Sequence, residues 1–312
     1  MAHNVTSMFS VRQVPWHGLG TIVQESLTSA SALKEAGLDW QVIQKPLYYL
    51  HDEQTRFAEG WMTNIRSDNG NVLGVVTDRY KVVQNVEAFE FIDTLLGYDV
   101  MYETAGALGG GKSVWLLAKL PEMYMVGDIV EPYLVFTTSH DGKNAIRACI
   151  APIRVVCQNT LNLALSKSKR AWSVRHMGDI KGKMNEAQVT LGLANQYMLD
   201  LSNVANSLVN QKIDKKYVQQ TVEFLFPVED EDSERRKTNQ KEAQEDIIWR
   251  LYNAPDLANI NDTKWGLINA ITDSNAHKEP ARVTDTYWEN MFTNIINGPA
   301  LVDRAYEYIT VR

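Results

Sequence analysis

The residues Gly106 to Ser113, GALGGGKS, match the pattern G-x-x-x-x-G-K-[ST] of the loop that binds phosphates in nucleotide hydrolases. In that loop a strand leads into a glycine turn, and a long helix follows whose free N–H groups face the phosphates. An aspartate at the end of a second apolar strand helps to hold Mg²⁺. The chemistry that such a motif supports is the hydrolysis of ATP or GTP.

The residues around the motif do not fit that loop. After Ser113 the chain reads VWLLAKL before Pro121, which is too short for the required helix and has the β-branched and aromatic character of a strand. The stretch YLVFTTSHD places polar residues before Asp141 and therefore lacks the expected magnesium aspartate. We predict a strand–glycine turn–strand hairpin that presents Lys112 to an anion, and the nucleotide loop remains the alternative.

Other reactive residue types lack the spacing of a catalytic or metal site. The histidines occur singly, without an H-x-x-x-H or H-x-H pair, and Cys149 and Cys157 could not bind a metal without several other ligands. The chain has no G-x-S-x-G sequence. We therefore expect no catalytic residues, no metal and no cofactor, in a protein that is not an enzyme.

The strongest physical signal is a basic segment in an acidic chain. Residues 141–183 carry nine Lys and Arg and only two Asp, a net charge of +7, whereas the whole chain has a net charge of −7. A basic cluster with polar and aromatic side chains suits a nucleic-acid backbone together with stacking on the bases. The alternative is a solvated basic face that pairs with the acidic run EDEDSE of this or a neighbouring copy.

The nucleic-acid hypothesis assigns specific residues. The backbone would lie along cations of this segment and of the glycine turn, with Trp172 as the stacking surface. The predicted nucleic-acid-binding residues are Lys112, Arg147, Arg154, Lys167, Lys169, Arg170, Trp172, Arg175 and His176.

The N-terminal part of the chain has the alternation and turn residues of β-hairpins. Residues 40–50 and 56–66 predict one hairpin, and VLGVVT with RYKVVQ predict a second around Asp78. The segment Asn85–Gly97 predicts a helix that Asn85 caps and Gly97 ends. Strands then resume in YDVMYETAGAL, KSVWLLAKL, YLVFTTSH and NAIRACIAP.

From about residue 185 the apolar residues recur with the period of helices. One long amphipathic helix is predicted by Val189, Leu193, Leu201, Val204 and Leu208. KKYVQQTVEFLF, QEDIIWRLYN, TKWGLINAITDS and PALVDRAYEYI predict further helices, and EDEDSERRK predicts a solvated loop. The predicted fold class is α+β, with N-terminal antiparallel β-hairpins and a packed helix, followed by an α-helical C-terminal half. The expected domains are a β-rich α+β domain, 1–184, which contains the basic segment 141–183, and a helical region, 185–312.

Several stretches together resemble one known family. MFSVRQVPWHGLG, AGLDWQV, AGALGGGKSVWLLAKLP, IRVVCQNTLNLAL, VRHMGDI and TKWGLINAIT are similar to the phage/plasmid-like family that carries a domain of unknown function numbered 932. The likeness runs nearly end to end, although Met177 stands where the family pattern has Thr. The resemblance implies a phage, prophage or plasmid origin and supplies no established activity.

The order of hairpins, helix and hairpins with a basic segment is also similar in outline to phage single-strand annealing proteins of the Red-beta and RecT kind. This likeness favours a non-catalytic protein that binds or anneals single-stranded DNA in recombination or replication, as a homo-oligomer. No apolar run approaches the roughly 18 residues that span a bilayer, so we expect a cytoplasmic protein of a bacterial host with no membrane partner. Two alternatives stay open: a protein-interaction accessory factor, for example in counter-defence, and a nucleotide-binding enzyme that uses Gly106–Ser113.

Overall fold

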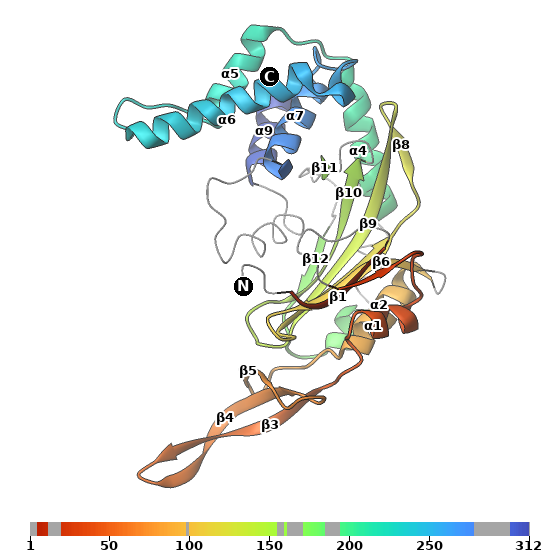
Figure 1. Cartoon of the computed structure of the whole chain (residues 1–312), viewed down its shortest axis with the longest axis vertical. Coiled ribbons are helices and arrows are strands. Elements are labelled where there is room, and N and C mark those ends of the chain that lie inside the picture. Colours follow the sequence, from red (N-terminus) through yellow and green to blue (C-terminus); the bar gives the residue numbers. More distant parts are fainter. Residues whose placement is uncertain are drawn as a thin grey trace. The chain divides into compact units, whose positions relative to one another are not determined.

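The chain forms two compact units whose segments alternate along the sequence. A computed structural model describes residues 5–11, 20–97, 100–154, 159–160, 171–184, 194–277 and 300–311. Unit 1 comprises Met1–Leu120, Tyr133–Ile150 and Arg170–Leu193, and unit 2 comprises Pro121–Pro132, Ala151–Lys169 and Ala194–Arg312. Strands dominate the N-terminal part and helices the C-terminal part (Figure 1), which confirms the predicted α+β class.

The larger sheet, most of which lies in unit 1, has the strand order β2-β1-β6-β7-β9-β10-β11, where β11 is Asn159–Thr160. In addition, β12 pairs with β10, and β8 (Met123–Met125) pairs with β9. Its other strands are β1 (Val5–Val11), β2 (Thr21–Val23), β6 (Met101–Leu108), β7 (Ser113–Lys119), β9 (Asp128–Ser139), β10 (Ile146–Arg154) and β12 (Ala171–Val174). The β1–β6, β6–β7, β7–β9 and β10–β12 pairs are antiparallel, and β2 runs parallel to β1. The four strands predicted from residue 98 onward are therefore confirmed.

A second, three-stranded sheet in unit 1, called the small sheet below, has the order β3-β4-β5. Its strands are β3 (Val42–His51), β4 (Gln54–Arg66) and β5 (Val72–Thr77), and Figure 1 shows β3 and β4 as a long hairpin. The first predicted hairpin is confirmed. The second is wrong, because β5 pairs with β4 and the residues RYKVVQ are not a strand.

The physical reason for that error lies in Tyr80 and Gln84. The Tyr80 ring is buried and its hydroxyl donates a hydrogen bond to the Ser139 carbonyl. Tyr80 is therefore a core residue of unit 1 without being part of a strand. The Gln84 side chain bonds both the N–H and the carbonyl of Val42, which takes the place of a partner strand. Alternation of residue types cannot distinguish such single contacts from a strand.

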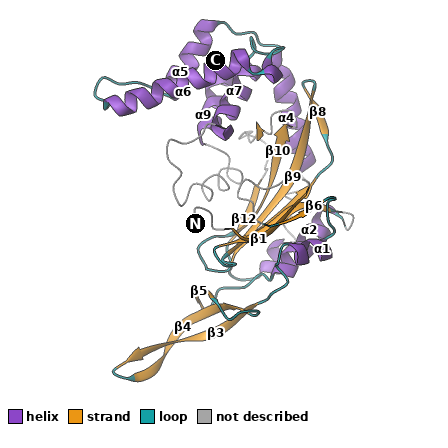
Figure 2. Ribbon diagram, viewed as in Figure 1, coloured by secondary structure: helices purple, strands orange, loops and turns teal. Residues whose placement is uncertain are grey.

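Helices α1 (Ser29–Glu35) and α2 (Asn85–Leu96) pack on the larger sheet, as the ribbon of Figure 2 shows. Gln84 and Glu87 form a capping box at the N-terminus of α2. The prediction that Asn85 caps this helix is therefore wrong. The Asn85 amide instead donates to the Leu38 carbonyl at 2.9 Å. Gly97 ends the helix with a φ of 95°, as predicted.

Unit 2 is mainly helical. Its helices are α4 (Ala194–Val209), α5 (Lys215–Leu225), α6 (Glu234–Asn253), the 3₁₀-helix η1 (Pro255–Leu257), α7 (Lys264–His277) and α9 (Ala300–Val311). The strand β8 (Met123–Met125) pairs with the start of β9, and β11 (Asn159–Thr160) pairs with the end of β10. The long predicted helix is confirmed over α4, and its start, with Val189 and Leu193, lies outside the described residues. The other four predicted helices are confirmed. The predicted loop EDEDSERRK is wrong from Glu234 onward, where α6 begins with Ser233 as the N-cap.

Helix α7 is the centre of unit 2. Every residue from Lys264 to Thr272 is buried, the polar Lys264, Asn269 and Thr272 included, so this part of the helix is covered on every side. Arg250 of α6 binds Asp246 at 2.9 Å and Asp273 of α7 at 2.6 Å, which joins the two helices. None of the helices in the described part of the chain is long and apolar enough to cross a membrane.

Candidate nucleic-acid interface

The segment Gly106–Ser113 is a hairpin, as predicted. Strands β6 and β7 pair through Gly106–Trp115 and Leu108–Ser113, and the turn between them contains Gly109, Gly110 and Gly111. These three glycines have φ angles of 60°, 78° and 104°, the left-handed region that favours glycine. The strand that follows the turn leaves no helix N-terminus to bind a phosphate.

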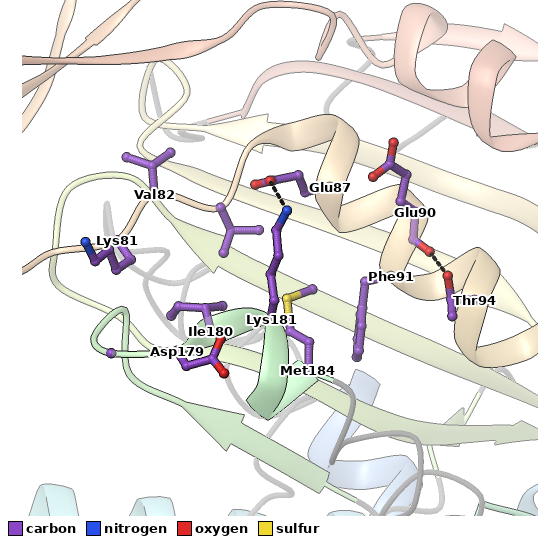
Figure 3. A pocket seen from close by; sticks show the side chains of 12 residues that line it. Lys81, Val82, Glu87, Glu90, Phe91, Thr94, Asp179, Ile180, Lys181 and Met184 are labelled. Atoms are coloured by element: carbon purple, nitrogen blue, oxygen red, sulfur yellow. Dashed lines mark hydrogen bonds and ion pairs between the residues drawn. The ribbon is translucent and has the colours of Figure 1, made fainter.

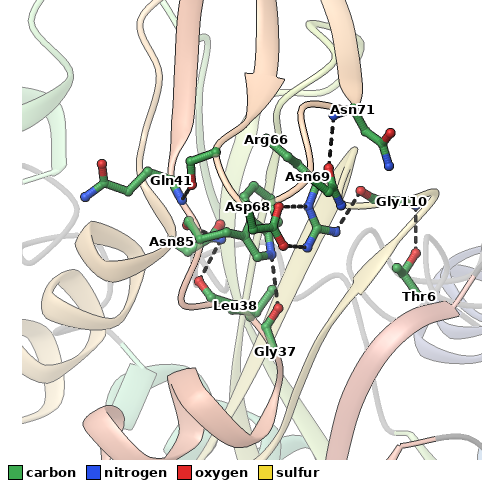
Figure 4. A network of polar contacts seen from close by, with 12 residues as sticks. Thr6, Gly37, Leu38, Gln41, Arg66, Asp68, Asn69, Asn71, Asn85 and Gly110 are labelled. Atoms are coloured by element: carbon green, nitrogen blue, oxygen red, sulfur yellow. Dashed lines mark hydrogen bonds and ion pairs between the residues drawn. The ribbon is translucent and has the colours of Figure 1, made fainter.

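The polar atoms of the glycine turn are used within unit 1 (Figure 4). The Gly110 N–H donates to Thr6 Oγ1 at 2.7 Å, and the Gly110 carbonyl accepts from Arg66 Nη1 at 3.0 Å. A Cβ on Gly111 would lie 2.9 Å from the Trp40 ring, so the backbone approaches that ring too closely for any other residue. The turn is thus a structural contact, and only the Lys112 side chain is exposed.

Arg66 fastens the small sheet to this turn. Its guanidinium lies 4.3 Å from the centre of the Trp40 ring and binds both carboxylate oxygens of Asp68, at 3.0 and 2.7 Å. The Arg66 side-chain hydrogen bond is the main cause that lowers the pKa of Asp68. One end of the small sheet is therefore fixed in position next to the β6–β7 turn.

The turn between β9 and β10 lies at the same end of the larger sheet. Ser113 pairs with Ser139, and the His140 N–H donates to the Lys112 carbonyl at 2.7 Å. A Cβ on Gly74 of β5 would collide with the Asp141 backbone, and one on Gly142 would lie 3.0 Å from Val76. These close approaches bring the small sheet, the β9–β10 turn and Lys112 together.

A cavity of about 670 Å³, called the Trp61 cavity below, opens where these elements meet. The small sheet contributes Trp61, Val75, Val76 and Thr77; the β9–β10 turn contributes residues 141–145; and the chain around the end of β12 contributes Arg175, His176 and Met177. Tyr80 also lines it. Trp61 is 47% exposed, so a large part of its ring is available to a ligand.

The charge around the Trp61 cavity is positive. Lys143 and Arg175 are exposed, and neither forms an ion pair with another residue in the described ranges. The one carboxylate among the lining residues is Asp141, whose Oδ1 accepts from the Lys143 N–H at 2.9 Å. Two free cations beside an exposed indole suit an anionic aromatic ligand.

A second cavity of unit 1, about 520 Å³, lies beside α2 and contains Phe91 (Figure 3). Its two lysines, Lys81 and Lys181, face three carboxylates, those of Glu87, Glu90 and Asp179. Lys181 lies 4.0 Å from Glu87, and Glu87 is also held by the capping box. The acidic excess makes this cavity less suited to a nucleic acid than the Trp61 cavity.

His176 and Trp172 are structural in the described part of the chain. His176 is 4% exposed, stacks on Tyr80 at 4.6 Å, and has Nδ1 2.9 Å from the Lys81 carbonyl and Nε2 3.3 Å from Thr138 Oγ1. Burial lowers the pKa of His176, so the ring stays neutral and carries no charge for a phosphate. Trp172 stacks on Phe91 of α2 at 5.9 Å.

The remaining predicted residues divide into three groups. Lys112 and Arg175 are exposed at the end of the larger sheet near the Trp61 cavity. Arg147 pairs with Ser173, whereas Trp172 pairs with Ala148, so Arg147 and Trp172 point to opposite faces of the sheet. Arg154 ends β10, its side chain lies outside the described residues, and Lys167, Lys169 and Arg170 lie outside them entirely.

The sequence reasoning missed Trp61 as a candidate. It lies in the first predicted hairpin, about 80 residues before the basic segment, and no local pattern links it to Lys143 or Arg175. A signal was nevertheless present, because Trp61 alternates with Thr63 and Ile65 on one face of a strand. No group of three or more His, Cys, Asp or Glu side chains in the described ranges could hold a metal ion.

The geometry defines an α+β protein with a cationic, aromatic cavity between a hairpin sheet and the turn of a larger sheet. The sequence model of the family described as "Domain of unknown function (DUF932)" matches residues 72–294. Because the match covers more than half of the chain, the protein belongs to this family. No curated protein and no solved structure matches the chain significantly.

Proposed function

We propose that this protein binds single-stranded DNA without catalysis, and that the Trp61 cavity takes one of its bases. The observation that carries the proposal is the exposed Trp61 ring beside the unpaired cations Lys143 and Arg175. Proteins that bind single strands combine aromatic side chains, on which bases stack, with cations that follow the phosphates. Lys112, at the adjacent turn, adds a third exposed cation.

The biological setting is part of the same proposal. We place the protein in the cytoplasm of a bacterial host, encoded by a phage or plasmid, where it holds or anneals single strands during recombination or replication. A homo-oligomer would repeat the cavity along one strand. The positive segment 141–183 in a chain of net charge −7 supports a polyanionic ligand, because it concentrates cations in one part of the sequence.

Binding should depend on Trp61. We expect Trp61→Ala to weaken binding of a fluorescently labelled oligothymidine by about 1–3 kcal/mol, the range for loss of one base–aromatic stack. Trp249→Ala is the matched control, because Trp249 is 61% exposed on α6 of unit 2. Fluorescence anisotropy measures both variants, and equal affinities for the two would contradict the assigned cavity.

The cations give an independent readout in the same assay. For a single strand the slope of log K against log salt is about −0.7 per neutralised phosphate, so Lys143→Ala with Arg175→Ala should reduce its magnitude by about 1.4. Lys215→Ala with Lys216→Ala is the control, since both lysines are exposed on α5. If neither the parent protein nor any variant binds the oligonucleotide, the proposed function is wrong.

A further inference from the structure

The small sheet has one buried and one exposed face. Val42, Asn64 and Val76 lie on the buried face, at 5%, 0% and 4% exposure. Cross-strand pairs place Ile43 with Ile65, and Thr63 with both Lys45 and Val75, on the other face. We call this second surface the exposed face, because Ile43 and Val75 on it are 42% and 45% exposed, while Thr63 of the central strand is covered, at 8%.

Exposed apolar side chains concentrate in this sheet. Of the 19 large hydrophobic residues exposed in the described part of the chain, eight lie in β3, β4 and β5. They are Ile43, Tyr48, Tyr49, Leu50, Phe57, Trp61, Val72 and Val75. Tyr48 pairs with Phe57, and both lie on the face opposite Tyr49, as does Leu50. Scattered single residues of this kind are ordinary, but their concentration in one hairpin sheet indicates a binding surface.

The charge on the exposed face indicates the kind of partner. Lys45 lies on that face opposite Thr63. The β3–β4 register shifts between Pro46 and Tyr48, and beyond the shift Tyr49, an even number of positions from Lys45 on β3, pairs with Arg56. Lys45, Tyr49 and Arg56 are exposed, and neither cation forms an ion pair with another described residue. The face therefore combines two free cations with aromatic and aliphatic side chains.

We infer that the exposed face carries the single strand onward from the Trp61 cavity, along β3 and β4. This inference rests on the proposed function, and Trp61 joins the two surfaces because it pairs with Thr77 on the exposed face. Aromatic and basic residues on an open sheet are a general means of binding single-stranded nucleic acid. Lys45 and Arg56 would contact phosphates, and Tyr49 would stack on a base.

The length of the face sets the expected contact. Ile43 and Tyr49 are six positions apart on β3, which corresponds to about 20 Å of extended strand. Stacked nucleotides in one strand of a duplex are spaced by about 3.4 Å, so the face accommodates up to about six of them. Affinity should therefore rise with oligonucleotide length beyond what the cavity alone binds.

The test compares two oligothymidines, one of about 4 and one of about 16 nucleotides, on the parent protein and on Tyr49→Ala/Arg56→Ala. We expect the double variant to bind the long oligonucleotide about 10-fold more weakly and the short one as well as the parent. Tyr49→Phe/Arg56→Lys should restore most of the loss. Tyr124→Ala/Arg235→Ala is the matched control, because both residues are exposed and lie in unit 2.

Each other result would overturn the inference. If the double variant binds both lengths as well as the parent, the face is not part of the DNA path, although the Trp61 cavity still stands. Equal losses at both lengths would mean that the face adds no length-dependent contact. A protein retained from host lysate after nuclease treatment, and lost only in the double variant, would assign the face to a protein. Failure of the parent to bind either length removes the proposed function as well.

Discussion

At the scale of single residues, His140 shows how a polar side chain can hold three elements together. It lies at the end of β9 with no exposed surface. Its carbonyl accepts from the Asn64 amide of the small sheet at 2.7 Å, and its Nε2 lies 3.1 Å from Asn85 Oδ1 of α2. Because the Asn85 amide nitrogen already donates to Leu38, Nε2 is the protonated nitrogen and donates to Oδ1.

Protonation of His140 should destabilise unit 1. Its Nδ1 has no hydrogen-bond partner among the described residues, and burial lowers its pKa to about 3. The unfolded chain takes up this proton near pH 6.5, whereas the folded chain does not, so stability falls as the pH drops below 6.5. Between pH 7 and pH 5 we expect a loss of about 2 kcal/mol in the free energy of unfolding.

Chemical denaturation at several pH values measures this loss. His140→Gln replaces the ring N–H donor with an amide donor of similar reach that does not titrate. The free energy of unfolding of this variant should therefore change less between pH 7 and pH 5. The neighbouring His176 also has a lowered pKa and adds to the dependence in both proteins. If the parent and the Gln variant have the same pH dependence, His140 is not its source.

At the scale of elements, the glycine turn of β6–β7 is the contact on which the small sheet rests. Gly111 permits the Trp40 ring and Arg66 to reach the turn, and Arg66 then joins the turn to Asp68. Trp61, on the same strand as Arg66, lines the cavity together with Lys143 of the β9–β10 turn. Packing of the turn therefore fixes the end of β4 that contains Arg66.

Gly111→Ala tests that role. It adds the strain of a φ of 104° and a contact at 2.9 Å with Trp40, so we expect a loss of about 2–3 kcal/mol in the free energy of unfolding. Gly70→Ala is the control, because Gly70 has a φ of 72° and nothing within 4 Å of its Cβ position. Its loss should be only about 1 kcal/mol. Equal losses in the two variants would show that the Trp40 contact is unimportant.

At the scale of the whole molecule, the distribution of charge and the bonding of the glycine turn favour single-stranded DNA over a nucleotide as the ligand. The chain has a net charge of −7, and the cations of the Trp61 cavity come from the positive segment 141–183. A nucleotide would need the glycine turn to act as a phosphate loop, but its Gly110 N–H and carbonyl are bonded to Thr6 and Arg66. The proposed binding of single-stranded DNA does not use the Gly110 N–H or the Gly110 carbonyl.

Thermal unfolding compares these ligands on the intact chain. A ligand that binds only the folded state at 100 times its dissociation constant adds about 2.7 kcal/mol of stability. We expect an oligothymidine to raise the melting temperature at low salt, and ATP with Mg²⁺ to leave it unchanged. A shift with ATP and Mg²⁺ that Lys112→Ala abolishes would instead support the nucleotide-binding alternative.

The sequence by itself determined the α+β class, the β3–β4 hairpin, helix α2 and the helices of unit 2, because periodicity and turn residues act within a few positions of the chain. It also predicted a hairpin turn at GALGGGKS, since the strand character after Ser113 is local, and the structure confirms that turn. Only the tertiary structure decided which residues surround the cavity. Trp172 stacks on Phe91 and does not line the cavity, and His176 lines it only as a buried, neutral ring, whereas Trp61 and Lys143 line it with exposed side chains. These differences depend on partners that are distant in sequence. The pairing of β5 with β4 was decided there too, through Tyr80, which packs in the core rather than in a strand.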